Sequence, residues 1–285
     1  MSNDRMGFVG ASEAPAVLGK DSFCSPLKLY SIKAGIIEPD DLSDNEAVEW
    51  GTRLERLVSA KFAEEHNVKI MAYKKRYVHP DYPFISCELD NIITGTDELV
   101  EIKTVNAWAW KAWENPDEFP EKVIIQVMTQ LGLSKRKVGW VACLCGGQKY
   151  IEKKIDFDPD FYAMIVSKIV DFWKAVQDKT PPMAIAGDAD LLIMTNPQTS
   201  QEIQAVESMN ESIKYMQECK MHRDNYNKEI DNVKAKIIQV IGGNSGIQTS
   251  QYMAKMIEMK AQEYVVKKEA TRQLRITKIK EAKHG

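Results

Sequence analysis

The feature that most constrains this chain is a pair of strand-like segments, residues 84–93 and residues 98–105, on either side of a turn at residues 94–97. The turn holds a glycine between polar residues, which is typical of a tight connection between antiparallel strands. Successive side chains of a strand point to opposite faces, so Glu101 and Lys103 share one face and their apolar neighbours share the other. The pattern therefore predicts a β-hairpin with one polar face.

Asp90 lies on the first of these two segments, where an antiparallel pairing can bring it beside Glu101 and Lys103. Two converging carboxylates can hold a hard divalent cation, and an adjacent lysine can position an attacking water. The alternative is a surface hairpin that carries a glutamate and a lysine on its wet face. The residue types thus leave two interpretations, a hydrolytic metal site or a plain solvated hairpin.

A helix is predicted over residues 46–66, because Leu54, Val58 and Phe62 recur at helical spacing. Glu55 faces nearly the same direction as this apolar stripe. A carboxylate at the edge of a buried stripe costs free energy unless it is paired or binds a cation. Glu55 is therefore either a rim glutamate that reaches solvent or part of the same cation site.

The chain has 285 residues, which exceeds the usual size of one domain. Pro181-Pro182 follows a predicted helix and suggests a division into residues 1–182 and residues 183–285. In the second part we expect a long helix over about residues 200–241, with an imperfect heptad suited to a helical hairpin or to another chain. A hairpin rich in Lys and Arg is expected over residues 252–280.

The net charge of −3 excludes a uniformly basic surface, but the charge is unevenly distributed. Residues 253–285 hold nine basic and four acidic side chains, a local balance of +5, which fits either a nucleic-acid contact or a solvated surface. Five scattered cysteines without a Cys-x-x-Cys pair argue against zinc and iron–sulfur sites. We expect reduced thiols, no signal peptide, no membrane span and a cytoplasmic location.

Four segments of the chain form a recognisable set. They are Gly10-Ala11-Ser12-Glu13-Ala14 with its continuation to Tyr30, Trp50-Gly51-Thr52-Arg53-Leu54-Glu55, the hairpin with Asp90 and Glu101-Ile102-Lys103, and Gln126-Val127-Met128-Thr129-Gln130-Leu131. In order and spacing this set resembles the lambda-exonuclease branch of the PD-(D/E)XK nucleases, also called YqaJ-like viral recombinases. The likeness covers roughly residues 1–180. It implies an α/β fold with a mixed central sheet flanked by helices, followed by an appendage.

The resemblance implies an Mg²⁺-dependent exonuclease, with Mn²⁺ as a possible substitute, that digests linear duplex DNA from 5′ to 3′. Asp90, Glu101 and the Ile102 carbonyl would hold the metal, with Glu55 at the rim or at a second ion. Lys103 would orient or deprotonate the water. An endonuclease of the same fold and a non-catalytic DNA-binding module remain as alternatives, and the intact Asp90, Glu101 and Lys103 speak against the second.

Arg5 and Ser12 match the pair with which the family grips a 5′-terminal phosphate. Without the resemblance, Arg5 would be a disordered N-terminal residue and Ser12 a plain helix cap. Gln126 and Gln130 are four residues apart and share a helix face, so either can support the site or simply be solvated. Where the family often has a second Gln, this chain has Met128, which cannot donate as an amide can.

The resemblance also implies a setting in phage or prophage recombination inside a bacterial host. The expected partners are double-stranded DNA ends and a single-strand annealing protein. Members often form trimeric rings, whose closed topology keeps the duplex from leaving.

A tryptophan-rich segment holds Trp108, Trp110 and Trp113 just after the predicted hairpin. We expect these rings to pack into the core. The alternative is that an exposed ring stacks against DNA bases.

Overall fold

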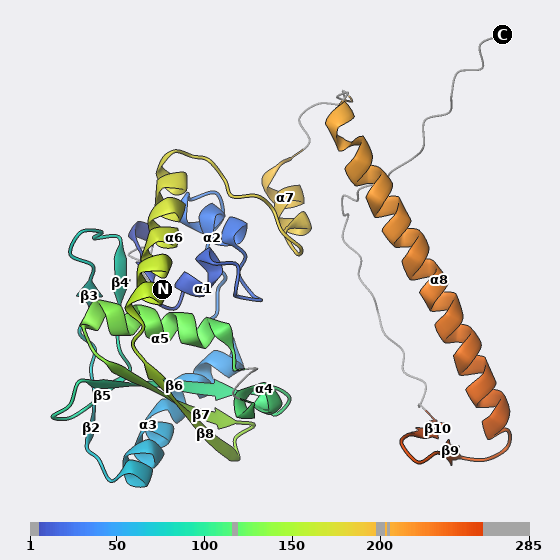
Figure 1. Cartoon of the computed structure of the whole chain (residues 1–285), viewed down its shortest axis with the longest axis horizontal. Coiled ribbons are helices and arrows are strands. Elements are labelled where there is room, and N and C mark those ends of the chain that lie inside the picture. The colour runs from blue at the N-terminus through green and yellow to red at the C-terminus, as the bar shows by residue number, and fades with distance from the viewer. Residues whose placement is uncertain (1–5, 116–118, 198–202, 204–205, 259–285) are drawn as a thin grey trace. The chain divides into compact units, whose positions relative to one another are not determined.

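A computed structural model of the chain describes residues 6–115, 119–197, 203 and 206–258 (Figure 1). The chain splits into two compact units, Met1–Pro197 and Gln198–Gly285. The first unit continues past Pro182, since the buried Asp188 accepts a hydrogen bond of 2.5 Å from the hydroxyl of Ser25. The division of function at Pro182 stays a prediction.

The centre of the first unit is a five-stranded sheet with the order β2-β5-β6-β7-β8 (Figure 1). β6 and β7 run parallel over their whole length, and the other neighbours are antiparallel. This mixed sheet, flanked by helices, confirms the predicted α/β class. Its strands are Ile70–Ala72 (β2), Asn91–Ile93 (β5), Glu98–Val105 (β6), Val138–Cys145 (β7) and Lys149–Asp156 (β8).

A second, three-stranded sheet has the order β1-β4-β3, with bounds Val9–Gly10 (β1), Ile85–Cys87 (β4) and Tyr77–Val78 (β3). The expectation of one continuous strand over residues 84–93 is wrong, because β4 and β5 belong to different sheets. Between them, the Glu88 carbonyl accepts a hydrogen bond from the Gln130 side chain, and the Asp90 carbonyl accepts one from the backbone N–H of Tyr73. These contacts replace the pairing of a continuous strand and place Asp90 at the break.

Helices cover both faces of the five-stranded sheet. On one face, α3 (Glu46–His66) packs Val58 and Phe62 against Val100 and Ile102 of β6. The other face carries the main core, which includes buried residues of α5 (Glu121–Ser134) and α6 (Pro159–Gln177). The predicted alternation along β6 is thus confirmed, with Val100 and Ile102 toward α3 and Glu101 toward α5. β6 is therefore the strand that carries the Glu101 carboxylate into the interior.

An ion pair fixes the N-terminal segment, which contains α1 (Ala14–Val17) and α2 (Pro26–Lys33). The Glu13 carboxylate accepts hydrogen bonds from the Gly10 N–H and from Lys33 Nζ, at 2.9 and 2.8 Å. The expectation that Ser12 caps the first helix is wrong, because Glu13 occupies the cap position. Ser12 does not cap the helix, and it is exposed on the preceding loop.

The second unit contains one long helix, α8 (Asn210–Ile241), preceded by a short 3-10 helix, Glu207–Met209, and followed by the strands β9 (Gly246–Gln248) and β10 (Met253–Lys255). β10 pairs antiparallel with β9. The basic hairpin was expected to pair residues 252–259 with a later strand. In the described part β10 pairs with the strand that precedes it. The expected later strand lies outside the described residues, so this hairpin stays a prediction.

Among the described residues, the first unit also contains the helices α4 (Trp110–Glu114) and α7 (Ala189–Thr195). Over the residues that the structure describes, none of the helices combines the length and the apolar character needed to cross a membrane.

Candidate active site

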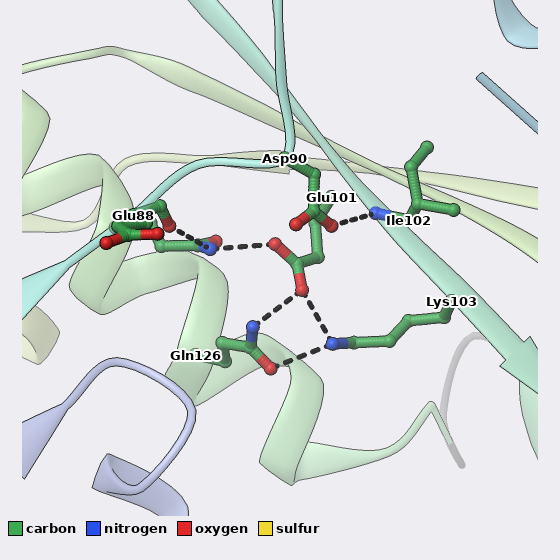
Figure 2. A network of polar contacts seen from close by, with 7 residues as sticks. Glu88, Asp90, Glu101, Ile102, Lys103 and Gln126 are labelled. Atoms are coloured by element: carbon green, nitrogen blue, oxygen red, sulfur yellow. Dashed lines mark hydrogen bonds and ion pairs between the residues drawn. The ribbon is translucent and has the colours of Figure 1, made fainter. Parts of the chain in front are cut away.

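Asp90 stands at the break between β4 and β5 and points toward β6 (Figure 2). Its carboxylate accepts a hydrogen bond from the Ile102 N–H at 2.9 Å. Burial, followed by repulsion from Glu101, raises the pKa of Asp90 to about 8, although the Ile102 N–H and Lys103 act in the opposite direction. This carboxyl therefore sits where negative charge is poorly compensated, as expected of a cation ligand.

Glu101 is almost completely buried, with 3% of its surface exposed, and three donors hold it. Lys103 Nζ and Gln126 Nε2 both donate to its Oε1 at 2.6 Å, and Gln130 Nε2 donates to its Oε2 at 2.7 Å (Figure 2). A buried carboxylate is stable only when such partners replace water. The site therefore holds Glu101 in one orientation before any ligand arrives.

Lys103 emerges from β6 two residues after Glu101 and bridges it to α5. Its ammonium donates to Glu101 and, at 3.0 Å, to Gln126 Oε1. Burial by itself lowers the pKa of Lys103, but the charges of Glu101 and Asp90 outweigh burial and place this pKa above its usual value. In this arrangement Lys103 is an ammonium that donates hydrogen bonds.

On α5, Gln126 and Gln130 lie one turn apart, and the side chains of both donate hydrogen bonds to Glu101. Met128 lies elsewhere on the helix, buried, and its sulfur accepts the backbone N–H of Asp158 at the start of α6. Its side chain therefore braces two helices. Gln130 Oε1 is buried without a hydrogen-bond partner among the described residues, so it can accept a hydrogen bond from a water or a ligand.

Glu55 lies on α3 and is half-buried. Its charge contributes to the raised pKa of Asp90, although less than burial and Glu101 do. This places Glu55 within electrostatic range of the site, in keeping with a role at its rim.

A hollow of about 300 Å³ lies beside these carboxylates. Its lining includes Ser12, Arg76, Glu88, Asp90, Gln126 and Gln130. The structure thus brings Ser12 to the same hollow as Asp90, whereas Arg5 lies outside the described residues.

Arg76 was not singled out from the sequence, yet it brings a cation to this hollow. Its guanidinium carbon lies 3.9 Å from the ring centroid of Phe8, and its Nε donates to Ser86 Oγ at 3.2 Å. Glu88 was missed as well. The only signal for Arg76 was a cation just before the strand Tyr77–Val78, and no pattern linked it to Asp90.

The residues present fit a hard divalent cation held by few protein ligands. Within the described part of the chain, no group of three Asp, Glu, His or Cys side chains is arranged to hold a metal. Mg²⁺, however, usually binds one or two carboxylates and keeps several waters. Asp90, Glu101 and the Ile102 carbonyl would form such a set, and a cation there would offset the charge that raises the pKa of Asp90.

The expectation that the tryptophans pack is correct for one ring and wrong for another. Trp113 is buried and meets Phe119 edge-on, with ring centroids 5.1 Å apart. Trp108 is 91% exposed, because the turn after β6 points it away from the core.

Residues 2–137 match the family model of the YqaJ-like viral recombinase domain. This span includes α3, the break at Asp90, β6 and the glutamines of α5. The resemblance to the YqaJ-like viral recombinases that the sequence suggested is thus confirmed over this part of the chain.

A relative of this YqaJ-like chain is the "Uncharacterized protein YqaJ" of Bacillus subtilis (strain 168), which is 33% identical over 172 residues, or 60% of this chain. The chain spans about half the length of that relative, 53% of it. Among solved structures, the alkaline exonuclease LHK-Exo from Laribacter hongkongensis aligns with a TM-score of 0.52 and 20% identity. The alignment covers 62% of this chain and 91% of that one, and a complex of LHK-Exo with dAMP aligns equally well. This likeness shows the exonuclease fold.

Proposed function

We propose that this YqaJ-like protein is a metal-dependent deoxyribonuclease that digests linear duplex DNA from the 5′ end. The observation that carries the proposal is the meeting of Asp90, Glu101 and Lys103 at one partly buried point. Two carboxylates beside an ammonium suit phosphodiester hydrolysis, in which a divalent cation and a proton donor face a phosphate.

Asp90, Glu101 and the Ile102 carbonyl would hold Mg²⁺, or Mn²⁺ in its place, with Glu55 at the rim. The bound cation would supply the positive charge that activates water and stabilises the phosphate. Lys103, kept protonated by Glu101, would hold the water and the phosphate by donating hydrogen bonds. Gln126 and Gln130 would keep Glu101 in place.

The hollow beside the carboxylates would receive the end of the DNA strand. Ser12 and Arg76 line it, and an arginine and a hydroxyl are suitable donors for a terminal phosphate. Arg5 would join them, as the resemblance implies. Loss of one such charged contact is worth roughly 1.5–3 kcal/mol, so Arg5→Ala or Ser12→Ala should bring the rates on 5′-phosphorylated and 5′-hydroxyl ends together. Unchanged discrimination would remove both residues from this role.

The setting that fits this activity is phage-type recombination in the cytoplasm of a bacterial host. There the single strand left by digestion would pass to an annealing protein. A closed homo-oligomer, trimeric by resemblance, would keep the duplex threaded and make digestion processive.

The test compares linear and closed circular duplex DNA, with and without a 5′-phosphate, in Mg²⁺ and in EDTA. We expect Mg²⁺-dependent release of nucleotides from linear DNA only. Cutting of the closed circle would indicate an endonuclease. Binding without cleavage in any metal would indicate a non-catalytic module of the same fold.

A further inference from the structure

Trp108 occupies an unusual place for a large apolar side chain. It is 91% exposed, whereas Trp113 in the same segment is 6% exposed. A single exposed apolar residue is ordinary, but a fully exposed tryptophan forgoes a large favourable burial. The ring lies shortly after the strand that carries Glu101 and Lys103, so its distance from these side chains matters.

The turn that carries Trp108 is held on both sides. Asn106 Oδ1 accepts the backbone N–H groups of Trp108 and Ala109, at 3.1 and 3.0 Å. Ala107 lies so close to Gly146, in the β7–β8 turn, that a Cβ there would come within 2.8 Å of the alanine Cβ. The backbone is thus fixed while the ring projects into solvent.

This turn directly continues the catalytic strand. Trp108 follows Lys103 by five residues, and five residues span at most about 18 Å. Bases of one DNA strand repeat every ~3.4 Å, so a ring at that distance lies within about five bases of the phosphate at the active site.

A second aromatic residue approaches the same end of β6 from α3. A Cβ at Gly51 would lie 3.3 Å from Thr104 Oγ1, so the first turns of α3 pass close to the C-terminal end of β6. The preceding residue, Trp50, is 55% exposed, and the guanidinium of Arg53 lies 5.7 Å from its ring centroid. An aromatic rim backed by a cation is typical of surfaces that follow single-stranded nucleic acid.

We propose that Trp108 stacks on a DNA base within about five nucleotides of the scissile phosphate. This inference rests on the proposed nuclease function and adds the base contact to it. Every base has a π face, so stacking holds the strand without reading its sequence, as a nuclease without sequence specificity requires. Trp108 would position the strand and leave the chemistry to Asp90, Glu101 and Lys103.

The test measures binding of frayed duplexes to the full chain in EDTA, so that no cleavage occurs. Trp108→Ala should weaken binding roughly 5- to 150-fold, the range of one base–aromatic stack, and Trp108→Phe should recover most of it. Tyr215→Ala, which removes a ring of the second unit that is 69% exposed, is the matched control and should change little.

A series of abasic substrates locates the contact. One base is removed at each of the first five positions of either strand, and binding is compared in wild type and Trp108→Ala. At one position, removing the base should weaken DNA binding by the wild type as much as Trp108→Ala does. Removing the same base should leave DNA binding by the Trp108→Ala variant unchanged. Equal losses at every position in both proteins would overturn the stacking contact.

Two further outcomes would also overturn it. If Trp108→Ala changes the sedimentation of the protein while binding per chain is kept, a second copy covers the ring. If the wild type neither binds nor cleaves any of these DNAs, the proposed function fails as well. A wild type that binds and cleaves beside an equally competent Trp108→Ala rejects the stacking contact alone.

Discussion

β6 and α8 are both regular elements with a clear apolar pattern, yet the central side chains of β6 are buried whereas most of those of α8 are exposed. On β6, Val100 and Glu101 are 0% and 3% exposed, and every oxygen of the Glu101 carboxylate has a donor. On α8, Val233 and Ile230 are 54% and 61% exposed, and Ile241 is its one buried residue. The comparison teaches that periodicity predicts an element, whereas long-range contacts decide whether it forms a site.

The largest expected effect concerns the buried carboxylates. Asp90→Asn, Glu101→Gln and Lys103→Ala should each lower cleavage by on the order of 10³-fold or more, because neutral or shortened side chains cannot supply the same charges. The readout is nucleotide release in Mg²⁺, with circular dichroism to show that the fold is kept. A folded variant with near-normal activity would mean that the site lies elsewhere.

The next effect concerns the glutamines that hold Glu101. Gln126→Ala or Gln130→Ala removes a hydrogen bond to a charged group, worth roughly 1.5–3 kcal/mol, so cleavage should fall by about 10- to 150-fold. Gln177→Ala, at the exposed end of α6, is the matched control. If all three variants behave alike, the glutamines do not position the carboxylate.

A matched pair of valines tests the comparison itself. Val100→Ala should destabilise the fold by about 2 kcal/mol, because it leaves a cavity in a packed core. Val233→Ala on α8 should change the free energy of unfolding by less than about 0.5 kcal/mol. Thermal unfolding of both variants provides the measurement. Equal losses would show that another chain or segment buries the α8 valine, and sedimentation would then separate those cases.

A further prediction concerns the change of stability with pH. The pKa of Asp90 is about 8 in the folded protein and about 3.9 when unfolded. Between these values the folded state holds a proton that the unfolded state lacks, so this carboxyl costs stability as the pH rises toward 8.

Asp90→Asn removes that cost and should raise Tm relative to wild type above pH 8, with a smaller gain at pH 5. The measurement is thermal unfolding without divalent metal. A gain that is the same at both pH values would contradict the raised pKa of Asp90.

The sequence predicted most of the elements, because their signals are local. The bounds of α3 were predictable from the helical spacing of Leu54, Val58 and Phe62. The split of residues 84–93 was not, since it depends on hydrogen bonds from Tyr73 and Gln130 to that segment.

For the site, the hairpin pattern and the resemblance were enough to select Asp90, Glu101 and Lys103. The clamp on Glu101 by two glutamines of α5 could only be proposed as support, because their direction depends on how the helix docks. Arg76 could not be found, because it reaches the hollow through its contact with the Phe8 ring, which is far away in sequence.

The most direct test of the central claim measures nucleotide release from a labelled linear duplex as Mg²⁺ is titrated, for wild type and Glu101→Gln side by side. The account predicts release that requires both the metal and the carboxylate, with closed circular DNA left intact. Metal-independent release, or equal release by a folded Glu101→Gln variant, would contradict it.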